Sequence, residues 1–314
     1  MTPAAPAAGS LASAVHAARE VARDIKLAHS VFALPFALLG AVYAATLDGA
    51  AVDWHRLGVD LALVVGCMVC ARTAAMVANR VLDHQLDARN PRTAGRAIPA
   101  GRLSVRAAVV AWVLAGGAFV ALTALFGVLH GNWWPLMLSV PVLAWICVYG
   151  LFKRFSAACH IWLGASLAMS PVAAALAVQP AAVATDFPWL LAAMVLCWVS
   201  GFDVIYALQD VAVDQREGLH SMPSRLGVAR AMWCARGLHL AAVAFLVAAW
   251  CSTDALGAVF GAAVGVVALL LVVEHATVHR WGTTRIAATF TTVNGAVSLA
   301  VGAAGIAGFL GWCR

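Results

Sequence analysis

The sequence is poor in charged residues. They make up only 11% of its 314 residues, whereas 63% of the chain is hydrophobic. Ordinary soluble domains carry roughly 25% charged residues. Disorder is excluded, because it requires low hydrophobicity and high charge. A soluble fold of this length could not bury so much apolar surface, so the composition predicts a protein whose main solvent is the lipid bilayer.

Cysteine is sparse as well, with eight residues in the whole chain. That density is far below the density of a disulfide scaffold. Most cysteines, such as Cys147 and Cys197, lie in apolar runs, where a thiol behaves as a small hydrophobe. We interpret the Cys67-x-x-Cys70 pair in the same way, as packing and not as a redox or metal motif.

Long apolar stretches are abundant. A transmembrane helix needs about 20 mostly apolar residues. We therefore expect an all-α, polytopic membrane protein with about nine transmembrane helices in a bundle and cytoplasmic cap loops. The expected spans are 30–48, 58–79, 105–127, 132–151, 159–178, 187–209, 232–251, 255–274 and 288–311.

The beginning of the chain differs from the rest. Residues 1–28 are rich in Ala and Pro and then carry several charges, with no continuous apolar core before them. This pattern favours an N-terminal tail with a short interfacial amphipathic segment that stays attached, and not a cleaved signal peptide. Residues 29–314 are expected to form the transmembrane domain.

The cations predict the orientation. Eighteen of the 20 Lys and Arg residues fall on one side of the expected topology, and only Arg56 and Arg314 fall on the other. Short cytoplasmic loops carry an excess of Lys and Arg. The N-terminus and the cation-rich loops are therefore expected in the cytoplasm and the C-terminus outside. The excess also suits contact with anionic lipid. The bilayer is an expected partner, and a nucleic acid is not.

Acidic residues are scarce, 14 in all, and one group of them lies at the end of the second expected span. Asn79, Asp83 and Asp87 are spaced i, i+4, i+8, which places their oxygen-bearing side chains on one face of a helix. Like charges along one face repel each other, and charge near the bilayer interior is costly. Mg²⁺ would compensate such a stripe, because it prefers carboxylate oxygens together with substrate phosphates.

A second acidic group lies at the end of the sixth expected span, on the same side. Asp203, Asp210 and Asp214 are spaced i, i+7, i+11 and are expected to form another narrow stripe. Arginine-rich loops follow, and guanidinium groups suit phosphate oxygens. One Asp-x-x-x-Asp stripe alone is typical of a solvated helix face paired with loop arginines. Two stripes on separate helices favour a site for Mg²⁺ and a diphosphate.

At this point the sequence resembles the UbiA superfamily of intramembrane prenyltransferases, over nearly the whole chain from Lys26 onward. The first family signature, Asn-Asp-x-x-Asp-x-x-x-Asp, stands here as Asn79-Arg80-x-x-Asp83-x-x-x-Asp87, followed by residues 92–101, Arg-Thr-Ala-Gly-Arg-Ala-Ile-Pro-Ala-Gly. Arg80 replaces the usual Asp and removes one carboxylate, and Ala97 replaces a usual Pro. The residues that carry the remaining resemblance are Tyr206, Asp210, Asp214 and Gly218, Lys153-Arg154-Phe155, and Arg72.

The resemblance implies transfer of a polyprenyl group from its diphosphate to an aromatic acid acceptor, 4-hydroxybenzoate in first place or a dihydroxynaphthoate, in ubiquinone or menaquinone biosynthesis at a bacterial-type inner membrane. It implies Mg²⁺ as cofactor. Asp83, Asp87, Asp210 and Asp214 are the expected catalytic residues, and with Asn79 they are the expected metal ligands. The residues expected to bind the diphosphate are Arg92, Arg96, Lys153 and Arg154.

Arg72 and Tyr206 are expected to bind the acceptor. For Arg72 two roles stay open: binding the acceptor's carboxylate, or compensating the charge of the aspartates. The alternative function is a secondary transporter whose intramembrane acids bind coupling ions. Transporters favour acids near the bilayer midplane, whereas both acidic groups here lie at expected helix ends.

Overall fold

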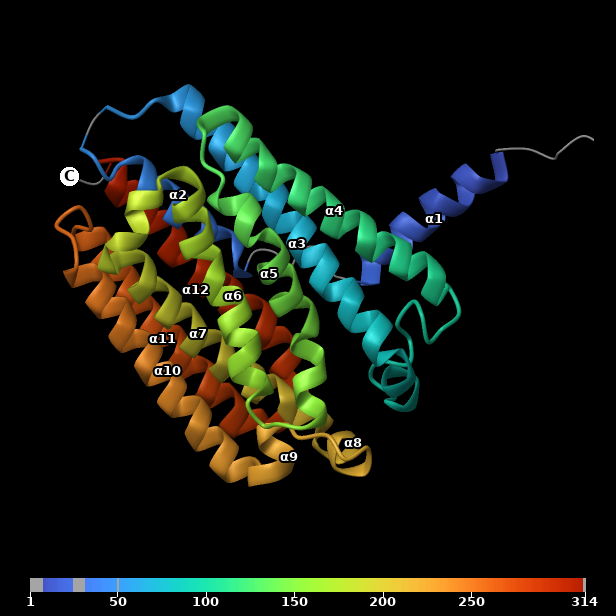
Figure 1. The fold of residues 1–314 in the computed structure, drawn as a ribbon. Helices are drawn as coiled ribbons and strands as arrows, with labels where there is room; N and C mark the ends of the chain where they lie inside the picture. The colour runs from blue at the N-terminus through green and yellow to red at the C-terminus, as the bar shows by residue number, and fades with distance from the viewer. Residues whose placement is uncertain (1–7, 25–31, 50, 313–314) are drawn as a thin grey trace, which may run out of the picture.

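The computed structural model describes residues 8–24, 32–49 and 51–312, and within these ranges helices are the only regular secondary structure (Figure 1). The expected all-α bundle is therefore confirmed. The α-helices are α1 (Ala8–Asp24), α2 (Leu34–Ala45), α3 (Trp54–Arg89), α4 (Val105–His130), α5 (Trp134–Val148), α6 (Cys159–Val178), α7 (Asp186–Ala207), α8 (Val211–Arg216), α9 (Met222–Leu226), α10 (Val228–Cys251), α11 (Ala258–Trp281) and α12 (Ile286–Phe309).

The number of membrane spans differs from the expected nine. Within the described residues, seven segments are long and apolar enough to cross a bilayer. Helix α2 has 12 residues and falls below that length, and α11 and α12 lie within a single 52-residue segment, Ala258–Phe309. Each of the nine predicted stretches does contain a helix in the described ranges. The polytopic membrane architecture is confirmed, but the count of nine is not.

Local sequence explains where several of these helices begin and end. The side chains of Asp53 and Ser104 accept hydrogen bonds from the backbone N–H groups of Arg56 and Ala107, which caps the starts of α3 and α4. Gly131 ends α4 with φ +69°, a backbone conformation that favours glycine. Helix α3 runs without interruption to Arg89, so the whole first acidic group lies on one helix.

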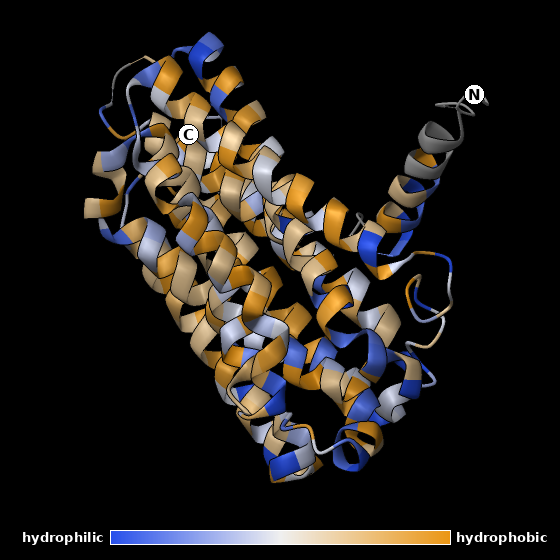
Figure 2. Cartoon of the chain, turned by 45° about the vertical axis from the view of Figure 1, so that its right-hand side comes forward, coloured by the Kyte–Doolittle hydropathy of each residue, from blue (hydrophilic) through white to orange (hydrophobic). Residues whose placement is uncertain are grey.

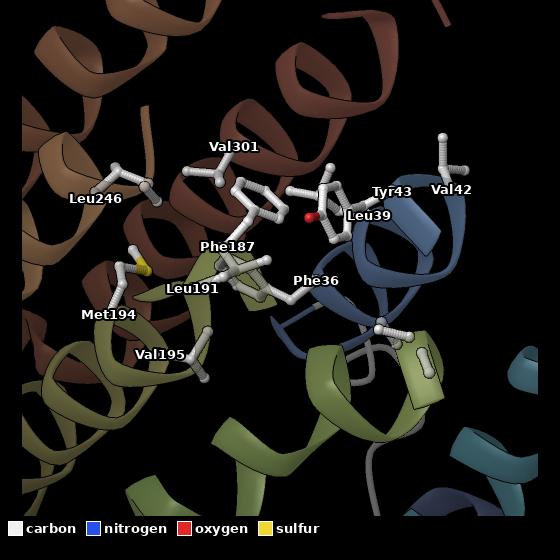
Figure 3. Close-up of a cluster of buried hydrophobic side chains, with 14 of the residues drawn as sticks. Phe36, Leu39, Val42, Tyr43, Phe187, Leu191, Met194, Val195, Leu246 and Val301 are labelled. Atoms are coloured by element: carbon white, nitrogen blue, oxygen red, sulfur yellow. The ribbon is translucent and has the colours of Figure 1, made fainter. Parts of the chain in front are cut away.

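The core lies where α2, α7, α10 and α12 meet (Figure 3). Trp198 of α7 and Phe36 of α2 are fully buried, and their rings lie 5.5 Å apart. Leu246 of α10 and Val301 of α12 are also fully buried in this cluster. These contacts pack the central helices together and fix the position of α7, whose C-terminal end carries part of the second acidic group.

The outer surface of the bundle is apolar along its length, with hydrophilic residues gathered towards its ends (Figure 2). Large side chains such as Val113, Leu240, Leu269 and Val272 are exposed there. A soluble protein rarely exposes so much contiguous apolar surface. The same distribution suits a protein surrounded by lipid chains.

A buried polar network joins the C-terminal helices to α7. The indole Nε1 of Trp198 donates to Asn294 Oδ1, at 2.8 Å, and Asn294 Nδ2 donates to Glu274 Oε1, at 3.0 Å. His239 Nδ1 lies 3.1 Å from His275 Nε2 and 3.9 Å from Glu274 Oε2. Polar side chains that bond across membrane helices hold them in register. The network therefore connects α7, α10, α11 and α12.

Candidate active site

A cavity of about 840 Å³ lies at the end of the bundle where α3 and α7 end. Its wall combines α1, α3, the loop between α3 and α4, the 3₁₀ segment η2 (Tyr149–Arg154), and the chain from α7 to α8. Both acidic groups contribute to this one wall, the first through Asn79 and Asp87 and the second through Asp203, Asp210 and Asp214. Two segments more than 100 residues apart thus share one site.

The first group is held by the loop that follows it. Arg96 Nη1 donates to both carboxylate oxygens of Asp87, at 2.6 and 2.7 Å. Thr93 Oγ1 donates to the backbone carbonyl of Asp87, at 3.1 Å. The loop therefore folds back over the end of α3, and the half-buried Arg96 forms an ion pair with the buried Asp87 on the cavity wall.

The second group does not lie on one regular helix, contrary to the expected stripe. Helix α7 ends at Ala207, a 3₁₀ turn η4 (Leu208–Asp210) follows, and α8 starts at Val211. Asp203, Asp210 and Asp214 consequently lie in three successive elements, and the change of helix type brings all three to the cavity.

The two groups are connected across the cavity by Arg92. Its Nε donates to Asp210 Oδ1 at 2.9 Å, and its Nη2 donates to Oδ2 at 2.5 Å. Burial by itself opposes the charge of Arg92, but its hydrogen bonds with Asp210 outweigh burial and raise the pKa of Arg92 above its ordinary value. Asn90 Nδ2 also donates to Asp210 Oδ1, at 3.0 Å. Arg92 further donates to the hydroxyl of Tyr206, at 3.3 Å.

Asp83 is buried beside the cavity with two cations on its carboxylate. Lys153 Nζ lies 2.6 Å from Oδ2, and Arg154 Nη2 lies 3.1 Å from Oδ1. Lys153 lines the cavity, whereas Asp83 and Arg154 are not among the described lining residues. Ion pairs thus join the three expected site residues Asp83, Lys153 and Arg154, and of these Lys153 lines the cavity.

Two further expected residues differ in position. Asn79 lines the cavity, and its Oδ1 is buried without a hydrogen-bond partner in the described part of the chain. Gly150 leaves the space for it, because a Cβ at Gly150 would clash with this oxygen. Arg72 is not among the described lining residues. Its Nε is buried and makes no hydrogen bond to any residue in the described ranges.

The structure adds residues that sequence reasoning did not single out. Ser221 Oγ donates to Asp214 Oδ2, at 2.5 Å. His160 Nδ1 lies 2.6 Å from Asp203 Oδ2, and its Nε2 accepts from the backbone N–H of Met222, at 3.1 Å. These contacts attach the segment around α9 to the acidic wall. Ser221 lies in the turn-rich segment after the second acidic group, whereas nothing in the sequence points to His160.

Helix α1 also contributes to the cavity, through Glu20, Arg23 and Asp24. Glu20 Oε2 accepts from Arg102 Nε, at 2.8 Å, which lowers the pKa of Glu20 below its ordinary value. Val21 is buried against the α3–α4 region. The segment expected at the membrane interface is therefore helical over Ala8–Asp24 and docks on the site.

The oxygen donors of the wall suit a hard divalent cation in their chemistry. Asp87, Asp210 and Asp214 offer carboxylates, and Asn79 offers an unpartnered amide oxygen, all on one cavity. Mg²⁺ prefers such oxygens. Over the ranges that the structure describes, no group of three or more His, Cys, Asp or Glu residues is arranged to hold a metal ion. Asp87 and Asp210 are instead each paired with an arginine, Arg96 and Arg92.

The described chain is thus a helical bundle of membrane-spanning length with paired acids and bases around one cavity at its end. The sequence model of the UbiA prenyltransferase family matches residues 33–310. The chain belongs to this family.

Curated relatives share part of the chain. A 4-hydroxybenzoate octaprenyltransferase of Edwardsiella ictaluri (strain 93-146) is 35% identical over 168 residues, which are 52% of this chain and 55% of the relative. One of Xanthomonas oryzae pv. oryzae (strain PXO99A) is 33% identical over 204 residues, which are 65% of each chain. The matched part thus spans between about half and two thirds of the length of these relatives.

Solved structures share the fold. The apo structure of a UbiA homolog from Aeropyrum pernix K1 has a TM-score of 0.77 and 30% identity and covers 88% of this chain and 96% of its own. A UbiA homolog from Archaeoglobus fulgidus bound to GPP and Mg²⁺ has a TM-score of 0.68 and 15% identity, with coverage of 92% and 99%. At that identity the second likeness shows the fold alone.

Proposed function

We propose that this protein transfers a polyprenyl group from a polyprenyl diphosphate to an aromatic acid, with release of diphosphate, in quinone biosynthesis. The acceptor is 4-hydroxybenzoate in first place, with a dihydroxynaphthoate as the alternative. The observation that carries this proposal is the single cavity on which Asp87 and Asp210 stand paired with Arg96 and Arg92. Its carboxylates suit a divalent cation, and its guanidinium groups suit phosphate oxygens.

The ion pairs explain how the site remains stable without substrate. A lone charge in this partly buried setting would be costly, and each pair reduces that cost. A magnesium diphosphate brings charges of both signs, so its phosphates would take Arg92, Arg96 and Lys153 while Asp87, Asp210, Asp214 and Asn79 would hold the metal. When bound, Mg²⁺ supplies positive charge that stabilises the leaving diphosphate.

Bond changes follow from the chemistry of an allylic diphosphate. The allylic C–O bond breaks, and its electron pair leaves with the diphosphate. A ring carbon ortho to the acceptor's hydroxyl then forms the new C–C bond, and the ring proton passes to a carboxylate or to the diphosphate. Arg92, Arg96 and Lys153 assist by hydrogen-bonding to the leaving oxygens, where charge develops.

The membrane position suits the donor. A polyprenyl tail is itself a lipid and can remain in the bilayer against the apolar bundle while its diphosphate occupies the charged cavity (Figure 2). We infer that the cavity faces the cytoplasm of a bacterial-type inner membrane, with the N-terminus on the same side, since the cation-rich loops lie at this end. The alternative of a secondary transporter is disfavoured by membership of a prenyltransferase family.

The test uses the full chain in lipid nanodiscs with geranyl diphosphate and Mg²⁺, offering 4-hydroxybenzoate or 1,4-dihydroxy-2-naphthoate in turn. Diphosphate release and product mass are measured together. The proposal expects a prenylated acid in one arm and its loss with EDTA, in Asp210→Ala and in Asp83→Ala. Asp254→Asn, an exposed acid far along the chain, is the matched control. A folded protein that prenylates neither acid overturns the function, and full activity in Asp210→Ala overturns the metal site.

A further inference from the structure

Arg80 occupies the cavity wall at the position where the family's first signature has an acid. It lies on α3 next to Asn79, and its side chain is 10% exposed. Its Nε donates to Asp24 Oδ2 of α1, at 2.9 Å. A positive charge therefore stands where the family signature places a negative one, and a carboxylate from another helix balances it.

Asp24 is firmly held on its other side. Its second carboxylate oxygen, Oδ1, accepts from the backbone N–H of Ala97, at 3.1 Å. Ala97 is fully buried and belongs to the loop that carries Arg92 and Arg96. Asp24 thus joins α1, α3 and the arginine-rich loop, with both oxygens occupied and the side chain 11% exposed.

The atom of Arg80 that Asp24 holds decides what the rest of the side chain can do. Asp24 takes the inner nitrogen, Nε, and the two outer Nη groups make no hydrogen bond to any residue in the described ranges. Arg92 and Arg96 differ, because one Nη group of each is already on a carboxylate, Arg92 Nη2 on Asp210 and Arg96 Nη1 on Asp87. Of these three arginines, Arg80 alone keeps both ends of its fork available.

A guanidinium whose two Nη groups are free can bind two oxygens of one oxyanion side by side. Asp24 restricts the rotation of the side chain, so less entropy is lost when that oxyanion binds. It also neutralises Arg80 while the cavity holds no substrate, which lowers the cost of keeping a guanidinium in this setting. Both substrates of the proposed reaction carry an oxyanion.

We propose that Arg80, held in orientation by Asp24, binds a substrate oxyanion in the cavity, either the carboxylate of the aromatic acid or a phosphate of the prenyl diphosphate. Arg80 is the contact residue, and Asp24 is a positioning residue. The inference rests on the proposed function and adds a residue that recognises the substrate. It also gives a role to the substitution of the signature acid.

A purely structural role makes a different prediction. If the pair only docks α1 on α3, exchanging the two charges restores both thermal stability and ligand affinity, because Asp24→Arg with Arg80→Asp keeps an ion pair. If Arg80 binds an oxyanion, the exchange restores docking but places a carboxylate in the wall where the anion binds. Thermal stability reports docking and ligand affinity reports the anion site, so the double variant separates the two roles.

The experiment measures binding by the full chain in nanodiscs, with 4-hydroxybenzoate and with magnesium pyrophosphate as separate probes. Arg80→Gln is expected to lower the affinity for one probe by roughly tenfold to a hundredfold, the loss expected for a charge-assisted hydrogen bond. The affected probe identifies which oxyanion is bound. Asp24→Asn is expected to lower the affinity for the same probe by a smaller factor. The double variant Asp24→Arg with Arg80→Asp should regain thermal stability but not affinity. Arg106→Gln, an exposed arginine at the start of α4, is the matched control.

An Arg80→Gln protein that binds both probes like the wild type overturns the proposal, and so does an exchanged variant that regains affinity. A wild-type protein that binds neither probe overturns the proposed function as well, which separates the two failures. If Arg80→Gln does not fold, Arg80→Lys takes its place. Binding of 4-hydroxybenzamide and of methylenediphosphonate is then measured for Arg80→Lys and for the wild type, beside the two original probes. Loss of preference for the acid over the amide, or for pyrophosphate over its analogue, in Arg80→Lys supports the proposal, and unchanged preferences overturn it.

Discussion

The guanidinium of Arg92 and the carboxylate of Asp210 form a two-pronged ion pair, with Nε 2.9 Å from Oδ1 and Nη2 2.5 Å from Oδ2. Arg92 belongs to the loop after α3, and Asp210 ends the 3₁₀ turn after α7. The pair therefore joins the two halves of the cavity and places an expected phosphate ligand on an expected metal ligand.

Replacing Arg92 by lysine should raise the KM for geranyl diphosphate by roughly tenfold, because an ammonium is a point charge and cannot reproduce the fork. Arg92→Gln should raise it further. Steady-state diphosphate release over a range of donor concentrations measures both. Arg225→Lys, an exposed arginine on α9, is the control and should behave as the wild type. An unchanged KM in Arg92→Gln would show that this guanidinium does not contact the donor.

Removing the carboxylate of Asp83 should destabilise the protein as well as inactivate it. Asp83 is 1% exposed and holds both Lys153 and Arg154. Asp83→Ala leaves these cations without their partner, at a cost of roughly 1–3 kcal/mol. Partial exposure of both cations favours the lower half of that range. The midpoint of thermal unfolding in detergent should fall relative to Asp254→Ala, and an unaltered midpoint would contradict the structural role.

Glu217 should make stability depend on acid pH. Hydrogen bonds from Arg89, and then from Arg216, lower the pKa of Glu217 below its ordinary value of 4.5. A carboxyl whose pKa is lower when folded stabilises the fold above its unfolded pKa, and that contribution is lost as pH falls through the folded pKa. Glu217→Gln should therefore unfold at a lower temperature than the wild type near pH 6.

The two proteins should converge as the pH falls through the folded-state pKa of Glu217, because the wild-type carboxyl then becomes protonated as well. Thermal unfolding followed at closely spaced pH values tests this convergence. A constant difference between the two proteins from pH 6 down through that pKa would assign the effect of Glu217 to something other than its charge.

Ser221 should support the activity of Asp214. Its hydroxyl donates to Asp214 Oδ2 and accepts the N–H of Ser224, which caps α9. Ser221→Ala removes a hydrogen bond to a charged group, and the rate should fall by roughly tenfold. Ser252→Ala is the matched control, because its hydroxyl only donates to a carbonyl at the other end of the bundle. Equal rates in the two variants would remove Ser221 from the site.

The solvent, the helical class and both acidic groups could be predicted from sequence, because each depends on local composition or on spacing within one segment. Nine apolar stretches contain helices in the described part of the chain, and Asn79, Asp83 and Asp87 lie on the single helix that their i, i+4, i+8 spacing requires. The break after Ala207 could not be predicted, because no Gly or Pro lies between Asp203 and Asp214 to mark an interruption of the helix.

Tertiary structure decided which side chains meet. Asp24 and Arg80 are 56 residues apart, Arg92 and Asp210 are 118 apart, and Trp198 and Asn294 are 96 apart. Local spacing cannot predict contacts between residues so far apart in the sequence, because these contacts depend on how the helices pack. The sequence by itself determined that the scarce charges would gather at the ends of a membrane bundle, since the bilayer interior excludes them. Only the packing of the bundle decided which acid would pair with which base, because buried charges must be matched across elements.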